Sequence, residues 1–172
     1  MPQKFSDGTA IYKKTLKGFV THKKGFFIVA PSGTGKSYFV RNQKTKHWID
    51  GDVVWKATGA IPKGDWWKGG LEKISDVDQK CDVITSECKR MGYWVLGASY
   101  YWLIPDAIVI PDLKQQKRYI KAREFGGYDG GAKEADMKNV LNHRKWLVAQ
   151  AKKNKVRVFK TIEDAVGALT KR

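Results

Sequence analysis

Residues 26–37 have the sequence FFIVAPSGTGKS, and this stretch decides the fold. Its first five residues form a short apolar run between a glycine and a proline, a pattern typical of a buried strand. Gly33 and Gly35 then allow the backbone to turn tightly, so that successive N–H groups converge on one point. A helix that begins at Lys36 directs its positive N-terminal end at the same point. This order of strand, loop and helix predicts a phosphate-binding loop in a variant form that starts with Ala30.

The residues of this loop have separate expected roles. We expect the Lys36 ammonium to bridge the terminal phosphates of a nucleoside triphosphate and the Ser37 hydroxyl to bind Mg²⁺. The residues expected to surround the phosphates are Ser32, Gly33, Thr34, Gly35, Lys36, Ser37 and Tyr38. The sequence therefore predicts ATP and Mg²⁺ as the bound groups.

A pair of acidic residues follows in the segment WIDGD, residues 48–52. Because the carboxyl ends of neighbouring parallel strands line one crevice, we expect Asp50 and Asp52 to face the bound phosphates. One of them is expected to accept a proton from an attacking hydroxyl, or to hold Mg²⁺ directly or through water. The pattern does not rank the two. The alternative is a turn or capping pair, since Asp-Gly is a common turn signal.

Strands and helices alternate along the rest of the chain. Strands are predicted over 26–30, 47–52, 93–98, 107–110 and 156–159, and helices over 9–22, 36–44, 74–91, 114–124, 135–153 and 162–170. Alternation of this kind predicts an α/β fold, with a parallel sheet of about five strands and helices on both faces.

The formal net charge of +16 is concentrated in two blocks of the 172 residues. Residues 1–24 carry a net charge of +5 and residues 114–160 a net charge of +10. We therefore expect a basic, helical N-terminal extension over 1–24 and a domain over 25–172. The charge predicts an anionic partner, which is a nucleic acid, a phosphorylated small molecule or an acidic membrane surface.

The segments APSGTGKS and WIDGD together resemble the small P-loop kinases, namely shikimate and gluconate kinases, nucleoside monophosphate kinases and the 5′-kinase domain of polynucleotide kinases. The resemblance covers roughly residues 25–170 and implies the three-layer sandwich of P-loop NTPases. The block IVIPDLKQQKRYIKAREFGG is similar to their fourth strand and arginine-bearing lid, which implies a lid at about 114–134. By the same comparison, Arg118 and Arg123 are lid arginines that close over the transferred phosphoryl group.

The predicted third strand departs from the wider P-loop pattern. It ends in YWVLGAS, without the acidic residue that many P-loop proteins place beside Mg²⁺. This departure leaves the second metal contact open, and it argues against a motor ATPase.

Tryptophan is concentrated between the two acidic residues and the next predicted helix. In a kinase of this type the segment would bind the phosphate acceptor, and the acceptor-binding candidates are Trp55, Trp66 and Trp67. A nucleobase stacks on an exposed indole of this kind. Ordinary packing of these indoles is the alternative.

Other patterns limit the location of the protein. Cys81 and Cys88 are two helical turns apart and are expected to be core residues, and no histidine accompanies them at metal spacing. Two cysteines in a chain of this length do not predict a disulfide framework, which favours a reducing, cytoplasmic compartment. The N-terminus lacks the apolar core of a signal peptide. The longest uncharged run, Gly92–Pro105, is shorter than the ~20 residues of a membrane span. A small, very basic kinase of this kind suits a virus or phage.

Three functions remain after this reasoning. The first is an ATP-dependent phosphotransferase whose acceptor is a nucleotide or a nucleic-acid 5′-hydroxyl end. The second is a nucleic-acid-binding P-loop NTPase or switch without a small acceptor. The third is a non-enzymatic binder, in which the basic N-terminus docks on nucleic acid or on a membrane. The sequence leaves the acceptor and the oligomeric state open.

Overall fold

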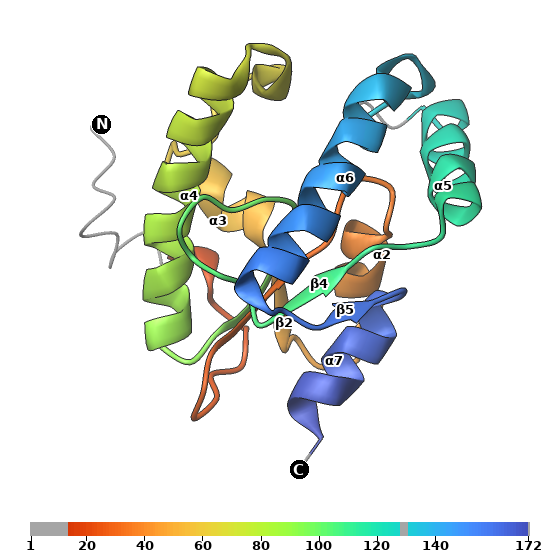
Figure 1. The fold of residues 1–172 in the computed structure, drawn as a ribbon. Coiled ribbons are helices and arrows are strands. Elements are labelled where there is room, and N and C mark those ends of the chain that lie inside the picture. Colours follow the sequence, from red (N-terminus) through yellow and green to blue (C-terminus); the bar gives the residue numbers. More distant parts are fainter. Residues whose placement is uncertain (1–13, 128–130, 172) are drawn as a thin grey trace.

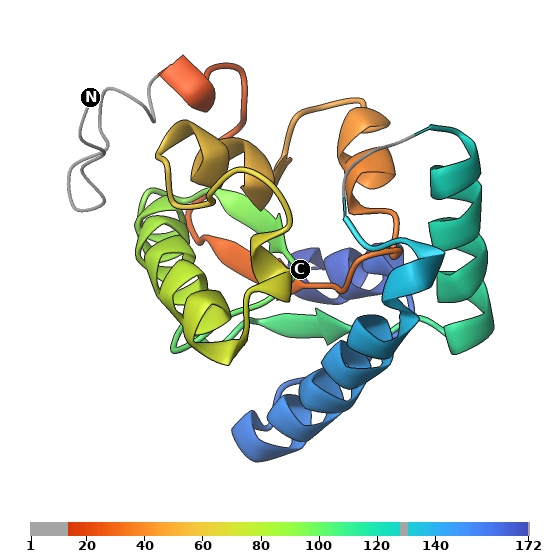
Figure 2. The ribbon, with the colours of Figure 1, turned by 90° about the horizontal axis from the view of Figure 1, so that it is seen from above.

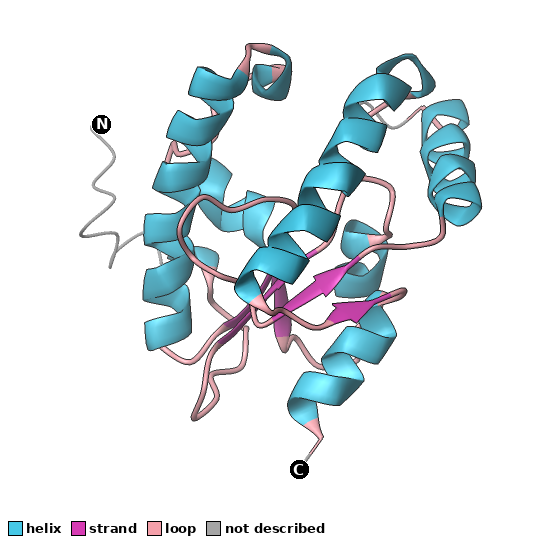
Figure 3. Ribbon diagram, in the orientation of Figure 1, coloured by secondary structure: helices cyan, strands magenta, loops and turns pink. Residues whose placement is uncertain are grey.

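The computed structural model of the chain describes residues 14–127 and 131–171. Its centre is a parallel sheet in the order β2-β3-β1-β4-β5, with helices around it (Figures 1 and 3). The strands are β1 (Phe26–Val29), β2 (Trp48–Asp50), β3 (Trp94–Gly97), β4 (Ala107–Val109) and β5 (Val158–Phe159). The predicted α/β class with a five-stranded parallel sheet is confirmed.

Both faces of the sheet are covered. The helices are α2 (Lys36–Arg41), α3 (Gly51–Ala57), α4 (Leu71–Arg90), α5 (Leu113–Phe125), α6 (Met137–Asn154) and α7 (Ile162–Thr170). Phe27 and Val29 point to one face, where they join a core built with α3, α4 and α6. Ile28 points to the other face, where it joins a core built with α2 and α7. Because successive side chains of a strand alternate between faces, a strand that is apolar throughout must be covered on both sides.

The central position of β1 places its carboxyl end between the ends of two neighbouring strands. β1 pairs with β3 on one side and with β4 on the other. The loop that follows β1 therefore starts in the middle of the sheet edge, and Ala30 N–H donates to the Gly97 carbonyl at 2.8 Å just beyond the paired strands. In Figures 1 and 2, β4 points toward the part of the molecule occupied by α2 and α5.

The connection from β3 to β4 lacks a helix, although it crosses β1. Instead, the segment between these strands runs in the gap between α4 and α6 (Figure 1). The Asp82 carboxylate of α4 holds this segment by accepting hydrogen bonds from three successive backbone N–H groups, those of Tyr101, Trp102 and Leu103, at 2.7–2.9 Å. The crossing is thus fixed by one buried side chain.

The N-terminal segment differs from the expected helix over 9–22. Residues 9–13 lie outside the described residues, and the helical turn ends at Thr15. Gly18 has a φ of 90°, which a continuing right-handed helix does not allow. Beyond it, the Val20 N–H donates to the Lys46 carbonyl, and Leu16 is only 3% exposed within the core. The described part of the expected extension is therefore packed on the domain.

Other differences concern element ends. Helix α3 was not predicted, because the acidic pair was assigned to a strand that in fact ends at Asp50. Helix α4 begins three residues before the predicted start. Cys81 and Cys88 are buried in the core, as predicted. Among the described residues, no helix combines the length and the apolar character needed to cross a membrane.

Candidate functional site

The loop between β1 and α2 has the backbone geometry that its glycines predict. Gly33 and Gly35 have φ angles of 85° and 89°, a region in which other residues are strained. A Cβ atom at Gly33 would also lie 2.7 Å from the Ile120 side chain of α5. The loop therefore depends on glycine at both positions, and at Gly33 for two reasons.

Lys36 folds back over this loop. Its Nζ donates to the carbonyls of Ala30 at 2.6 Å and Pro31 at 3.1 Å. Burial lowers the pKa of Lys36, Asp50 and Asp52 raise it, and the positive charge of Arg123 lowers it further. The ammonium is thus held on the loop carbonyls, and two carboxylates and a second cation are near enough to change its pKa.

Asp50 connects the loop to β2. Its Oδ2 accepts a hydrogen bond from the Ser37 hydroxyl at 3.0 Å, and its Oδ1 accepts one from the Asp52 N–H at 3.2 Å. The second bond caps the start of α3. A hydroxyl and a carboxylate oxygen in contact are the kind of ligands that Mg²⁺ prefers. Asp50 therefore both caps a helix and completes an oxygen pair with the loop.

Asp52 lies one position into α3 and has a different environment. Burial raises the pKa of Asp52, the negative charge of Asp50 raises it further, and Lys36 and Lys56 lower it. Its carboxylate still reaches solvent. The two acidic residues, which the sequence did not rank, thus separate into an anchored carboxylate and an accessible one with an increased proton affinity.

Helix α5 touches the loop through Arg123. The Arg123 Nη2 donates to the Ser32 hydroxyl oxygen at 3.0 Å and to the Ala132 carbonyl, and the Ala132 N–H donates to the same Ser32 oxygen at 3.1 Å. Arg118 is exposed on another side of α5, because five residues turn a helix by about 140° beyond a full turn. The structure brings one of the two predicted lid arginines to the loop and leaves the other in solvent.

The remaining predicted loop residues are placed as follows. The Thr34 hydroxyl donates to the Pro31 carbonyl and so closes the loop on itself. Tyr38 is 67% exposed and lines a hollow of about 580 Å³ between α2 and α7, on the other face of the sheet. Its side chain therefore lies apart from the residues that surround Lys36.

Gln116 and Arg144 belong to this network and were not predicted. The Gln116 side chain is fully buried, and its Nε2 donates to the Ser32 carbonyl at 2.8 Å. Its Oε1 accepts from Arg144 Nη1 of α6 at 2.8 Å. Gln116 and Ile120 are uncharged residues four positions apart in a basic helix, and that spacing is the signal that identifies the inward face.

His143 is a further residue that the sequence did not single out. Burial lowers the pKa of His143 to about 4, the positive charge of Lys36 lowers it too, and a hydrogen bond with the Ala98 backbone raises it. Its buried Nε2 has no hydrogen-bond partner among the described residues. Ala98 directly follows β3, at the strand end where many P-loop proteins have an acidic residue and this sequence has none. A neutral imidazole of α6 therefore lies at this edge of the sheet, within range of the Lys36 charge.

A buried carboxyl of α4 lies behind the end of β3. The Ser99 hydroxyl donates to Asp78 Oδ2 at 2.8 Å. Burial raises the pKa of Asp78 to about 7, the bond from Ser99 opposes this rise, and the charge of Asp82 adds to it. Asp78 is therefore a buried group of α4 that titrates near neutral pH.

The predicted acceptor-binding tryptophans differ in accessibility. Trp55 is 5% exposed, its Nε1 donates to the Thr85 hydroxyl at 3.0 Å, and its ring packs where a Cβ of Gly51 or Gly97 would lie. Trp66 packs partly against the core. Trp67 is half-buried, with the Lys68 ammonium 5.0 Å from its ring centroid. The structure thus assigns Trp55 to packing and leaves part of Trp67 accessible.

Lys68 also joins two parts of the chain that are far apart in sequence. Its ammonium lies 3.0 Å from Asp65 and 3.3 Å from Asp136, which directly precedes α6. The segment with Trp66 and Trp67 is therefore tied to the start of α6.

Comparisons with known proteins give no further information on this arrangement. No family model, no curated protein and no solved structure matches the chain. Within the described residues, no group of three or more His, Cys, Asp and Glu side chains could hold a metal ion.

Proposed function

We propose that the protein is an ATP-dependent phosphotransferase of the small P-loop kinase type, which transfers the γ-phosphoryl group to a nucleotide or to a nucleic-acid 5′-hydroxyl end. The observation that carries this proposal is the bond between the Ser37 hydroxyl and Asp50, at 3.0 Å, beside the Lys36 ammonium. It joins the loop after β1 to the acidic pair after β2, as phosphoryl transfer from a nucleotide requires.

The arrangement of the sheet supports the same proposal. In open α/β sheets, ligands bind outside the carboxyl ends of the strands. The loop lies at the end of the central strand β1, and the acidic pair lies at the end of β2, two strands away. The P-loop sandwich implied by the sequence accounts for this strand order and for helices on both faces.

The donor set fits Mg²⁺. Ser37 and Asp50 supply oxygens only, and Mg²⁺ in nucleotide sites commonly uses one or two protein oxygens together with water and phosphates. In this proposal Ser37 and Asp50 hold the ion, which neutralises charge on the β- and γ-phosphates when it is bound.

Lys36, Arg123 and Asp52 have the remaining roles in this proposal. Lys36 leaves the Ala30 and Pro31 carbonyls to contact phosphate oxygens, and Arg123 stabilises charge on the transferred group. With a 5′-hydroxyl acceptor, Asp52 accepts the hydroxyl proton while the acceptor oxygen bonds to the γ-phosphorus and the bond to the ADP oxygen breaks. A nucleotide acceptor would attack through an ionised phosphate oxygen, which has no such proton to lose. Its raised pKa makes it a stronger proton acceptor than an ordinary aspartate.

A transfer assay tests the proposal. The protein is incubated with γ-labelled ATP, Mg²⁺ and separate acceptors, which are nucleoside monophosphates and 5′-hydroxyl oligonucleotides. The proposal predicts label on one class of acceptor. Release of labelled phosphate without any labelled acceptor, stimulated by polynucleotide, would instead support the alternative of a nucleic-acid-dependent NTPase.

A further inference from the structure

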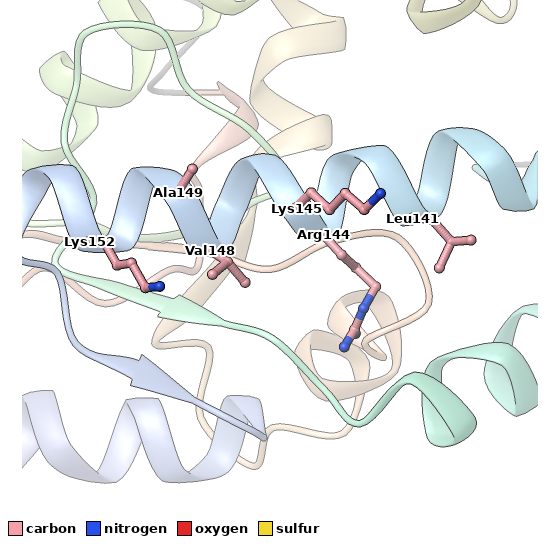
Figure 4. A pocket seen from close by; sticks show the side chains of 6 residues that line it. All are labelled: Leu141, Arg144, Lys145, Val148, Ala149 and Lys152. Carbon is pink, nitrogen blue, oxygen red and sulfur yellow. The ribbon is translucent and has the colours of Figure 1, made fainter.

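Helix α6 has an outward-facing stripe that the phosphotransfer site does not use. Leu141, Lys145, Val148 and Lys152 recur at intervals of three or four residues and therefore share one side of the helix. Together with Arg144 and Ala149, which are on the same helix, they line a shallow hollow of about 490 Å³ that is open to solvent (Figure 4). We call this hollow the α6 groove.

The α6 groove lies in the most uniformly basic part of the chain. Residues 137–160 contain eight Lys and Arg and no Asp or Glu. Neither Lys145 nor Lys152 forms an ion pair within the described residues, whereas Lys160 is paired with Asp112 at 3.2 Å. Uncompensated like charges in one groove repel one another, and an anionic polymer relieves that repulsion.

The groove is not only basic. Val148 is 42% exposed, and Leu141 is half-buried beside it. These apolar side chains alternate with the cations, as Figure 4 shows for Lys145, Val148 and Lys152. The core-facing side of α6 is made by Val140, Leu147 and Ala151, so the stripe is free of any packing role in the sheet core.

This alternation selects among anionic partners. A single-stranded nucleic acid offers phosphates to the cations, and it offers ribose and base faces to the apolar side chains. An acidic peptide matches the cations alone. A helix that binds a membrane surface inserts a free apolar face, whereas the apolar face of α6 is buried in the core.

The groove is also connected to the candidate site. Arg144 lines the groove, and its Nη1 donates to Gln116, which in turn bonds the Ser32 carbonyl of the phosphate-binding loop. From Leu141 to Lys152 the helix rises about 16 Å. A strand bound along the groove therefore extends from the neighbourhood of the loop toward the far end of α6.

We propose that the α6 groove binds the backbone of a single-stranded nucleic acid, so that the phosphate acceptor is a polynucleotide end and not a free nucleotide. The identity of the acceptor rests on the proposed phosphotransfer. The binding itself does not, and it is tested separately.

The first experiment measures binding by fluorescence anisotropy with a labelled single strand of about twelve nucleotides, within the usual size of such sites. The affinity is measured at several salt concentrations. In K145A/K152A, the slope of log affinity against log salt decreases in magnitude by about 1.4, since each phosphate contact to a single strand contributes about 0.7. V148E, which adds a carboxylate to the groove, also weakens binding.

The matched control is K44A/K171A. It removes two exposed lysines that lie after α2 and after α7, on the opposite face of the sheet, and it changes the net charge by the same amount. Its slope stays that of the wild-type protein. Equal slopes for the two double variants, or equal competition by polyglutamate of the same charge, would overturn the proposal. Thermal unfolding of each variant checks that the fold is retained.

The second experiment separates this proposal from the proposed function. Transfer of label to a 5′-hydroxyl oligonucleotide is compared for wild-type protein and K145A/K152A. We expect a lower kcat/KM in the variant. Transfer at the wild-type efficiency would reject the groove as the binding site of the acceptor and keep the kinase. Binding that depends on Lys145 and Lys152, with no transfer to any acceptor, would keep the groove and reject the kinase.

Discussion

The two ends of the parallel sheet use polar side chains in different ways. At the carboxyl end, Lys36 donates hydrogen bonds to two loop carbonyls, and Asp50 accepts hydrogen bonds from the Ser37 hydroxyl and from a helix N–H. At the amino end, the His22 ring is stacked on Trp94 with ring centroids 3.4 Å apart, and His22 and His47 share a hydrogen bond of 3.3 Å. The first arrangement places charges of both signs around an accessible loop, whereas the second fastens the N-terminal segment to the sheet.

The two ends of the sheet therefore separate residues expected to act in transfer from residues expected to act in stability. Groups at the carboxyl end carry shifted proton affinities, since burial lowers the pKa of Lys36 and raises the pKa of Asp52. Groups at the amino end make aromatic contacts that hold one segment in place. Substitutions at the first end should change transfer, and substitutions at the second should change stability alone.

Apart from the loss of Lys36, the largest effect is expected from Arg123→Ala. The variant should lose about 10³-fold in kcat, the lower range for arginines that stabilise a transferred phosphoryl group. Arg118→Ala is the matched control, because Arg118 lies on the same helix but faces solvent. Steady-state kinetics measure both variants. Equal losses in the two would contradict the assignment of Arg123 to the site.

A smaller loss, about 10²-fold in kcat, is expected for Asp52→Asn, because a general base contributes about this much. Wild-type activity should decrease as pH falls through the raised pKa of Asp52, since the protonated carboxyl cannot accept the acceptor proton. The variant should lose this limb of the pH profile. Asp50→Asn should instead raise the Mg²⁺ concentration needed for half-maximal activity. Identical behaviour of the two variants would reject the division of roles.

The next effect concerns stability. Burial raises the pKa of Asp78 to about 7, above its ordinary value of 3.8. Between these values the folded chain keeps a proton that the unfolded chain releases. Stability should therefore decrease as pH rises through this window, by up to about 1.4 kcal/mol per pH unit. Asp78→Asn removes this dependence and should be more stable than the wild type at pH 8.

Urea unfolding at several pH values measures this effect. The control is Asp76→Asn, which removes an exposed carboxylate on the same helix. A wild-type stability that rises with pH between pH 4 and pH 7, relative to Asp78→Asn, would contradict the buried, proton-holding state of Asp78.

The smallest effect is expected at the amino end. His22→Ala removes the stack on Trp94 and the bond with His47, and the loss of such a ring pair costs about 1 kcal/mol. Thermal unfolding measures this cost, and transfer activity should stay unchanged. A large loss of transfer in this variant would contradict the assignment of transfer to the carboxyl end of the sheet and of stability alone to the amino end.

The sequence predicts those parts of the site that lie within one segment. The strand, loop and helix around Gly33 and Lys36 follow from local backbone requirements, and the acidic pair follows from its position after a strand. The boundary between β2 and α3 was not predicted. Asp50 caps the start of α3, but in the sequence its Asp-Gly pair is also a common turn signal.

The residues that were not predicted depend on contacts between distant segments. Gln116 and His143 become important only when α5 and α6 pack against the loop. The spacing of Gln116 and Ile120 indicates which face of α5 is inward, but no local pattern indicates that this face meets the loop. Trp55 is the opposite case, because the sequence assigned it a role in the site and the structure buries it. Its neighbours suggested an acceptor surface, but the absence of side chains at Gly51 and Gly97 makes room for its ring inside the core.

The most direct test of the proposed phosphotransfer is the activity of Lys36→Ala with γ-labelled ATP, Mg²⁺ and the acceptor panel. The proposal predicts transfer by the wild-type protein and none by the variant, with the thermal unfolding of the variant showing a retained fold. Transfer by the variant at the wild-type rate would contradict the role of the loop and, with it, the proposed function.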